Sequence, residues 1–244
     1  ERLKDLTQRK QVLRNWSVKN LGTDTPLGFL KPFEEGKKVY AEMIIKDEKR
    51  HAILTKHDHN IDVHPFLKQA VSDGSVCMPF DRLQKMIPEA PLIFLELTLG
   101  RTVKGSVKIR LDKNLTKTRD YIVQIVTGQR GATMVGISLS HHHMYGLYQT
   151  SLPFSEMKFT PDSNGKSIAK RGDVTGFLSS NKYLQEIFFH MTIPPNTYDY
   201  DSHHGRGFCV FGHIEEGMDV IQECYDNYSS GVKISDCGLV IKQE

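Results

Sequence analysis

Histidines gather at three places in this chain, and imidazole is the side chain here best suited to metal binding or proton transfer. They lie at 141–143, at 203–204 with Asp199 or Asp201 nearby, and at 57–59 around an aspartate. Imidazole and carboxylate groups are zinc ligands, and imidazole also titrates close to neutral pH. Adjacent side chains on a strand point to opposite faces, so each group would offer only one or two ligands. We therefore expect a polar, pH-sensitive surface and no metal, with a helix-ending loop at 57–59.

Cysteine is the other side chain whose placement could indicate chemistry. Cys77, Cys209, Cys224 and Cys237 show neither the CxxC spacing of a zinc or redox site nor the density of a secreted disulfide framework. Cys209 and Cys237 fall in expected strands and are interpreted as small buried apolar residues, whereas Cys224 is expected on a helix with partial exposure. We predict no catalytic thiol and a reducing, intracellular compartment.

Length and composition exclude several classes of protein. The chain has 244 residues, of which 39% are hydrophobic and 25% charged, with a net charge of +3. No apolar run of about 18 residues is present that could span a bilayer. A charge of +3 is too small to indicate nucleic-acid binding. We expect no membrane and no nucleic acid as partner, no cofactor, and further residues before Glu1, where neither Met nor an apolar leader stands.

The first 90 residues are predicted to be a mostly helical extension. The apolar residues near the start share one helical stripe: Leu3, Leu6, Leu13 and Trp16. Pro32 suits the first position of a second helix running through Val39 and Met43 towards Leu54. Short apolar-periodic pieces follow and end near Pro91. Because these stripes are too thin to close a core, the extension should pack on the rest of the chain or on a partner.

From Leu92 the apolar spacing becomes alternating, which is typical of strands. The inward positions expected in a first hairpin are Ile93, Leu95, Leu97, Leu99, Val107, Ile109 and Leu111. One helix is predicted from a Thr116 cap to a Gly128 stop, and another from Glu216 to about Tyr225. Further strand-like runs lie at 187–192, 207–211 and 238–241. This pattern indicates a closed barrel capped by two helices.

Residues from about 91 to 243 resemble the cyclophilins, a family of peptidyl-prolyl isomerases. The pieces that carry the likeness follow one another in family order: 94–97 (Phe-Leu-Glu-Leu), 105–111 (Gly-Ser-Val-Lys-Ile-Arg-Leu), 117–121 (Lys-Thr-Arg-Asp-Tyr), 210–212 (Val-Phe-Gly), 216–221 (Glu-Gly-Met-Asp-Val-Ile) and 234–238 (Ile-Ser-Asp-Cys-Gly). The resemblance implies a mainly β fold. Its expected form is an eight-stranded closed antiparallel β-barrel capped by two α-helices in residues 91–244, after the extension of residues 1–90.

The family's catalytic groove is matched only in part. Cyclophilins carry a Phe-His-Arg triplet, whose Arg is thought to hydrogen-bond the carbonyl of the substrate proline, and a later Phe-x-x-Gln. In the matching segment Gln149 falls on the family's Gln. His141 takes the place of the Arg without gaps, and Ser140 or His142 takes it with a shift of one residue. Neutral imidazole offers one donor where guanidinium offers a permanently charged fork, so the resemblance implies that the main catalytic donor is lost.

Other groove positions depart from the family as well. Phe189 matches the family's hydrophobic-pocket Phe, but the His that normally precedes Val-x-Phe-Gly reads Phe208, and the family's later Trp is missing because Trp16 is the one tryptophan of the chain. We therefore predict no catalytic residue. The remnant of the groove would consist of His141, His142, Gln149, Phe189 and Phe208.

The leading hypothesis is a non-catalytic scaffold whose extension and barrel loops bind protein partners in a larger intracellular assembly. Some N-terminally extended cyclophilin-like proteins belong to ciliary or cytoskeletal assemblies, so the cytoplasm, the cytoskeleton and the ciliary axoneme are the candidate locations. The alternative is a weak peptidyl-prolyl cis-trans isomerase using Gln149, Phe189 and one of His141 or His142. A third interpretation, an RNA-associated module, needs a basic surface that the charge of +3 does not promise.

Overall fold

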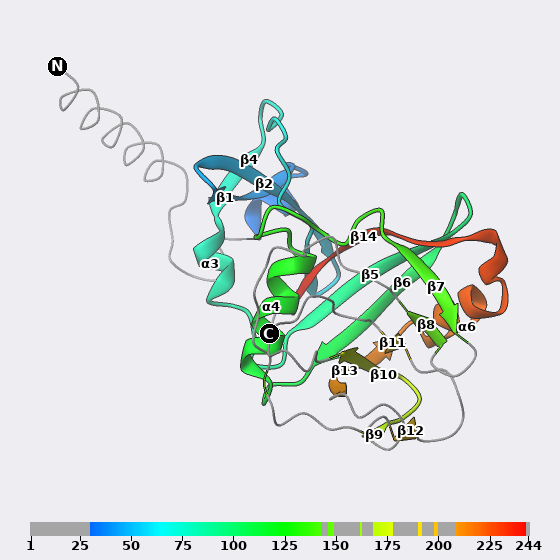
Figure 1. Cartoon of the computed structure of the whole chain (residues 1–244). Coiled ribbons are helices and arrows are strands. Elements are labelled where there is room, and N and C mark those ends of the chain that lie inside the picture. Colours follow the sequence, from blue (N-terminus) through cyan, green and yellow to red (C-terminus); the bar gives the residue numbers. More distant parts are fainter. Residues whose placement is uncertain are drawn as a thin grey trace.

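The computed structural model describes residues 30–142, 146–148, 162, 168–177, 190–191, 198–199 and 208–242. Strands dominate it (Figure 1): β1 (Val39–Ile45), β2 (Glu48–His57), β3 (Asn60–Val63), β4 (Val76–Pro79), β5 (Leu92–Leu99), β6 (Thr102–Leu111), β7 (Ser138–His142), β8 (Gly146–Tyr148), β9 (Ile168–Ala169), β10 (Asp173–Phe177), β11 (His190–Met191), β12 (Tyr198–Asp199), β13 (Phe208–Glu216) and β14 (Val232–Lys242). The described helices are α2 (Lys31–Glu34), α3 (Phe80–Gln84), α4 (Thr116–Val126), α6 (Met218–Asp226) and the 3-10 turn η2 (Tyr228–Ser230). None of these helices is both long and apolar enough to cross a membrane.

One large sheet holds twelve of the strands, in the order β4-β1-β2-β3-β14-β5-β6-β13-β10-β11-β8-β7, and β12 pairs separately with β9. β14 is long enough to pair with β7 near its start and with β3 near its end. Because β14 pairs with both β5 and β7, the eight strands β14-β5-β6-β13-β10-β11-β8-β7 form an antiparallel ring. The branch β3-β2-β1-β4 extends from β14 and ends at β4, which has no second strand neighbour among the described residues, so the sheet as a whole is not closed.

The prediction of a mainly β fold is confirmed, and eight of the strands after residue 91 form the ring, but the described residues hold more strands than the eight predicted. The described residues after 91 hold ten strands, and four more strands from residues 39–79 join the same sheet. The two predicted helices are confirmed as α4 and α6, the second starting two residues later than expected. The last strand is longer than predicted, since β14 begins at Val232.

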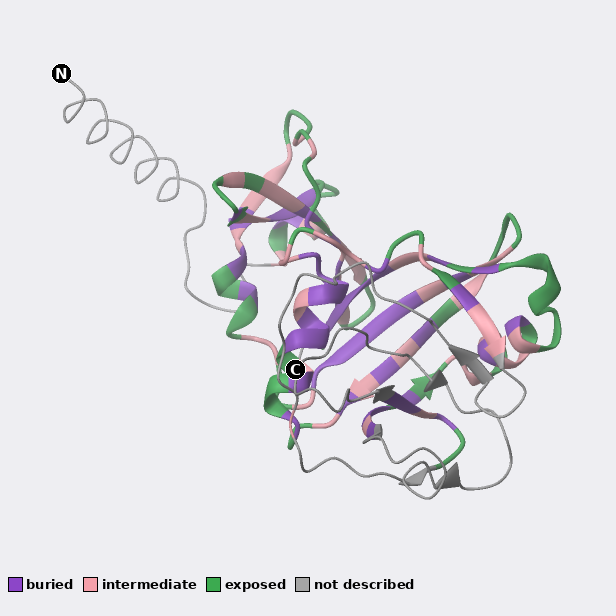
Figure 2. Ribbon diagram, viewed as in Figure 1, coloured by how far each residue is buried: buried purple, intermediate pink, exposed green. Residues whose placement is uncertain are grey.

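The β5–β6 hairpin and α4 lie at the centre of the core. Ile93, Leu95 and Leu97 on β5 are fully buried, as the alternation predicts, and Val107 and Ile109 on β6 are buried beside them. Figure 2 shows this burial as a continuous band along β5 and α4. The apolar faces of the hairpin and the helix therefore form one hydrophobic core.

The ends of α4 differ in how well the sequence predicts them. Gly128 follows the helix with φ of 69°, the left-handed conformation expected at a helix stop. Thr116 is not the cap: Leu115 precedes the helix and makes no side-chain cap bond. Instead, the Asp162 carboxylate accepts hydrogen bonds from the Thr118 backbone N–H (2.9 Å) and hydroxyl (3.1 Å). A carboxylate from a distant segment thus satisfies a helix N-terminus.

The helical extension predicted for residues 1–90 is wrong over 39–79, which hold four strands. Val39 and Ala41 are buried on one face of β1, with a period of two instead of the predicted helical period. Lys46 and Asp47 form the β1–β2 turn with φ of 50° and 63°, the positive values of a type I′ hairpin.

The remaining predictions for residues 1–91 concern a loop, a short helix, the first apolar stripe and the domain boundary. The loop at 57–59 joins the hairpin strands β2 and β3 and does not end a helix. α2 starts at Lys31, one residue before the predicted first position at Pro32, and spans a single turn. The apolar stripe at 3–16 lies outside the described residues, and the domain boundary at 91 stays a prediction.

β3 fastens this segment to the last strand of the chain through four residue pairs with β14. Gly238 permits the close approach, because a Cβ there would overlap the carbonyl oxygen of Val63. Phe66, just after β3, is buried edge-on against Phe80 with ring centroids 5.0 Å apart. Its backbone N–H donates to the Thr127 carbonyl (2.8 Å) at the end of α4. Residues 39–80 therefore share their core with the strands after 91.

A chain of polar contacts crosses the same junction. Thr55 Oγ1 lies 2.9 Å from His64 Nε2, and His64 Nδ1 lies 2.7 Å from an Asp236 carboxylate oxygen. The other oxygen of Asp236 accepts the N–H of Cys237 at 2.8 Å. These groups come from β2, the end of β3 and β14, so the polar side chains at the junction satisfy one another as they leave water.

Candidate functional site

The segment matched to the family's catalytic strand forms the β7–β8 hairpin, in which His141 lies opposite Leu147 and His142 opposite Gly146. β8 continues sideways to β11, β10 and β13, so the backbone of Phe208, the first residue of β13, lies three strands from β8 in the same sheet. Gln149 and Phe189 lie outside the described residues. The structure thus places three of the five predicted groove residues on one sheet and leaves two of them untested.

The His141 ring is engaged with aromatic side chains at the end of α6. It stacks on Tyr228 of η2, with ring centroids 4.0 Å apart and planes 14° apart, and it lies 4.3 Å from the Tyr225 ring at 41°. Leu139, two residues earlier and on the same face of β7, is buried. His141, the residue predicted to stand in the place of the family's Arg, therefore packs against the end of α6 and η2, a contact that stabilises by about 0.5–1.5 kcal/mol per ring pair.

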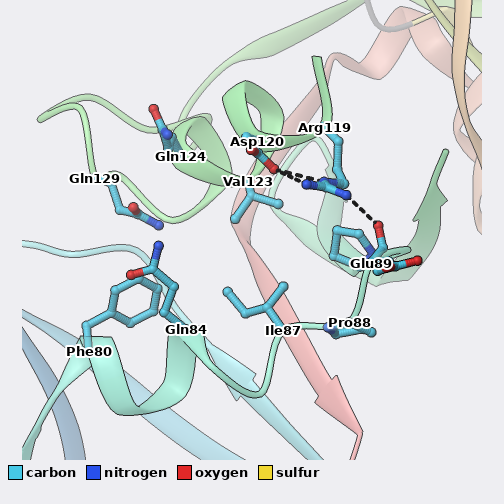
Figure 3. Close-up of a pocket in the computed structure, with 11 residues that line it drawn as sticks. Phe80, Gln84, Ile87, Pro88, Glu89, Arg119, Asp120, Val123, Gln124 and Gln129 are labelled. Atoms are coloured by element: carbon cyan, nitrogen blue, oxygen red, sulfur yellow. Dashed lines mark hydrogen bonds and ion pairs between the residues drawn. The ribbon is translucent and has the colours of Figure 1, made fainter. Parts of the chain in front are cut away.

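A pocket of about 350 Å³ lies elsewhere, between α3 with its following residues and α4 (Figure 3). Phe80, Ile87 and Val123 supply apolar walls. The side chains of Gln84 and Gln129 point toward one another on one side of it (Figure 3). The volume is at the small end of the range for small-molecule sites.

The charged end of this pocket is held in place by hydrogen bonds. The Arg119 guanidinium donates to the Glu89 carbonyl (2.9 Å) and pairs with the Asp120 carboxylate (2.8 Å). Amides and an ion-paired guanidinium can orient a polar ligand, so the chemistry here is binding. One lining residue, Arg119, falls in the segment 117–121 that resembles the family, whereas the wall at 80–89 belongs to the region predicted as a helical extension.

Buried thiols account for three of the four cysteines. Cys209 and Cys237 are buried as predicted, and Cys224, predicted to be partly exposed, is buried as well because it faces the core from α6. Burial raises the pKa of Cys209 to about 12 and the pKa values of Cys224 and Cys237 to about 11. These three thiols stay protonated at neutral pH, and none is a nucleophile.

Comparison with known proteins gives no match in sequence and some in structure. No protein-family model matches the chain, and no curated protein matches it in sequence. Among solved structures, the crystal structure of the Mimivirus cyclophilin is similar over 64% of this chain and 93% of its own, with 14% sequence identity and a TM-score of 0.46.

Proposed function

We propose that this chain is a non-catalytic, cyclophilin-like scaffold that binds protein partners within a larger intracellular assembly, with cytoskeletal and ciliary assemblies as candidates. The observation that carries the proposal is the packing of His141 against Tyr225 and Tyr228. The position that holds the catalytic Arg in cyclophilins is used here for packing.

The barrier to proline isomerisation sets how much rate is lost when the Arg donor is missing. Rotation about an X-Pro bond faces a barrier near 20 kcal/mol, which a preorganised donor lowers by favouring the twisted amide. Loss of one such donor typically costs about 3–4 kcal/mol, or two to three orders of magnitude in rate. An imidazole ring stacked on Tyr228 has at most two N–H donors and does not replace the five-donor fork of a guanidinium.

Exposed apolar side chains support a role in partner binding. Ile44 on β1 is 71% exposed, Val103 on β6 54% and Tyr228 50%. Aromatic and large apolar residues commonly anchor protein interfaces. In this proposal the partners contact the strands before residue 91 and the barrel loops. The strands at 39–79 thus take the role that the sequence analysis assigned to a helical extension.

A protease-coupled isomerase assay on proline tetrapeptides tests the proposal. We expect background rates for the unmodified chain and for His141→Arg, because one restored donor does not recreate the positioning that the other groove residues provide. An active cyclophilin in the same assay is the positive control.

The same assay decides the alternative, a weak peptidyl-prolyl isomerase, which draws on the cyclophilin-like fold. Turnover of the unmodified chain within about tenfold of the positive control would overturn the scaffold proposal. Gln149→Ala and Phe189→Ala would then be the first variants to assay, because the weak isomerase would depend on both.

A further inference from the structure

Three side chains with metal-binding groups meet on one face of the strands that precede residue 91. Glu42 on β1 lies directly opposite His51 on β2, and Cys77 on β4 pairs with Tyr40, two residues before Glu42. One carboxylate oxygen of Glu42, one ring nitrogen of His51 and the Cys77 sulfur all lie within 4.8 Å of one another. Residues two apart on a strand share a face, so the strand register itself brings the three groups together.

The His51 ring is held by a hydrogen bond that suits a metal ligand. Its Nδ1 lies 3.0 Å from the backbone carbonyl of Gln69, and because a carbonyl only accepts, Nδ1 carries the proton. Nε2 is then unprotonated and has a lone pair to donate. The Gln69 side chain returns a hydrogen bond to the His51 carbonyl (3.0 Å), which fixes the two segments together. Histidines that bind metals commonly donate their second N–H to a carbonyl in this way.

Cys77 is the cysteine of this chain that an ion can reach. The other three, Cys209, Cys224 and Cys237, are buried, whereas Cys77 is half-buried. Thiolate, imidazole and carboxylate are the three protein ligands of zinc. One thiolate and one carboxylate would also neutralise the charge of a divalent ion.

Lys49 is the competitor at this site. Its ammonium lies 3.0 Å from a Glu42 carboxylate oxygen in an exposed ion pair. Exposed pairs of this kind contribute at most about 1 kcal/mol, which a bound dication readily exceeds. Entry of the ion therefore requires Lys49 to swing into solvent, and the length of its side chain allows this.

We propose that Glu42, His51 and Cys77 form a zinc site with a fourth position open to solvent. In tetrahedral zinc coordination the ligand atoms stand about 3.4–3.6 Å apart, so the three groups close on the ion through small side-chain rotations. Cys77 loses its thiol proton to solvent on binding, and the zinc–sulfur bond forms in its place. The ion would tie β4, the end strand of the sheet, to β1 and β2.

Cobalt(II) absorption and zinc calorimetry on the full chain, without a histidine tag and with its thiols reduced, test this site. We expect one equivalent of Co²⁺ to give a thiolate-to-cobalt charge-transfer band that Zn²⁺ abolishes. Cys77→Ser should remove the band and weaken zinc binding by at least about 100-fold, beyond the effect of losing an outer partner of a ligand. Circular dichroism of Cys77→Ser should match the unmodified chain, since the substitution is nearly isosteric at a half-buried position.

Lys49→Gln and Lys68→Gln form a matched pair. Both remove an exposed lysine from an ion pair, with Glu42 and with Glu48 respectively, but only the first frees a proposed ligand. Zinc should bind more tightly to Lys49→Gln alone. Equal affinities in the two variants would remove Glu42 from the site and overturn the three-ligand assignment. Absence of the band, or its survival in Cys77→Ser, would overturn the site altogether.

Discussion

The strands before residue 91 and the β7–β8 hairpin are attached to opposite ends of β14 by different contacts (Figure 1). β3 joins β14 through four residue pairs, and Phe66 is buried between the two parts of the molecule. β7 reaches β14 through two pairs, and His141 on β7 packs against aromatic rings at the end of α6. Both attachments reach the hydrophobic core, the first through Phe66 and the second through Leu139, and the second adds the stacked rings of His141 and Tyr228 at the rim.

The two attachments differ in how much of each is buried. The junction at Phe66 is continuous with the buried face of β5 and α4, so residues 39–80 are as much a part of the core as the barrel strands. The His141 contact lies at the rim, where Tyr228 is 50% exposed. We expect substitutions at this rim to affect the core less than substitutions at Phe66.

Phe66→Ala should have the largest effect on stability, because it removes a buried ring from the junction between residues 39–80 and the strands after 91. Phe66 is 1% exposed, and removal of a buried phenyl ring costs about 3–5 kcal/mol of unfolding free energy. Leu67→Ala is the matched control. Leu67 follows Phe66 directly and is 47% exposed, so its substitution should change the unfolding free energy by no more than about 0.5 kcal/mol. Chemical denaturation measures both. Equal and small effects would show that residues 39–80 are not part of the shared core.

The sequence predicts the barrel elements better than the strands before them. In the β5–β6 hairpin the apolar alternation and the outward polar residues agree, and Gly128 marks the end of α4. In β1, Val39 and Met43 are also four residues apart, which fits a helix as well as a strand. The turn that would have decided between them uses Lys46 and Asp47 at positive φ in place of the usual Asn-Gly, so no hairpin signal is present.

Candidate sites were predictable only where neighbours in space are also close in sequence. The resemblance at 139–149 predicted that His141, or a residue next to it, stands in the place of the family's Arg, but the contacts of His141 with Tyr225 and Tyr228 depend on how α6 returns to β7. Glu42, His51 and Cys77 are brought together by the register of three strands, two of which were predicted as one helix. A search for metal-binding residues at a fixed sequence spacing cannot find such a cluster when its strands are predicted as a helix.

His141→Ala should destabilise the chain less than Phe66→Ala does, because it removes packing between β7 and the end of α6. Loss of the two ring contacts should lower the unfolding free energy by about 1–2 kcal/mol. His141→Phe keeps a ring of similar shape without the imidazole nitrogens, so its stability should stay close to that of the unmodified chain. Thermal unfolding of the two variants tests this. If Phe destabilises as much as Ala, His141 acts through hydrogen bonds and not through packing.

Asp62→Asn should have the smallest effect and the opposite sign. Burial raises the pKa of Asp62 above its ordinary value of 3.8, although His57 and His64 nearby oppose the shift. A raised pKa means that the fold disfavours the ionised carboxylate relative to the unfolded chain. Stability contributed by the protonated form is therefore present at low pH and is lost as the pH rises through the unfolded value and then the folded value.

Denaturation of Asp62→Asn and of the unmodified chain at two pH values shows this sign. Asparagine cannot ionise, so the variant should be the more stable of the two near pH 7, by less than the loss in His141→Ala. The difference should vanish near pH 3, where Asp62 is protonated in both states. A less stable variant at neutral pH would mean that the ion pair with His57, at 3.7 Å, outweighs the cost of burying the carboxylate where β3 meets β14.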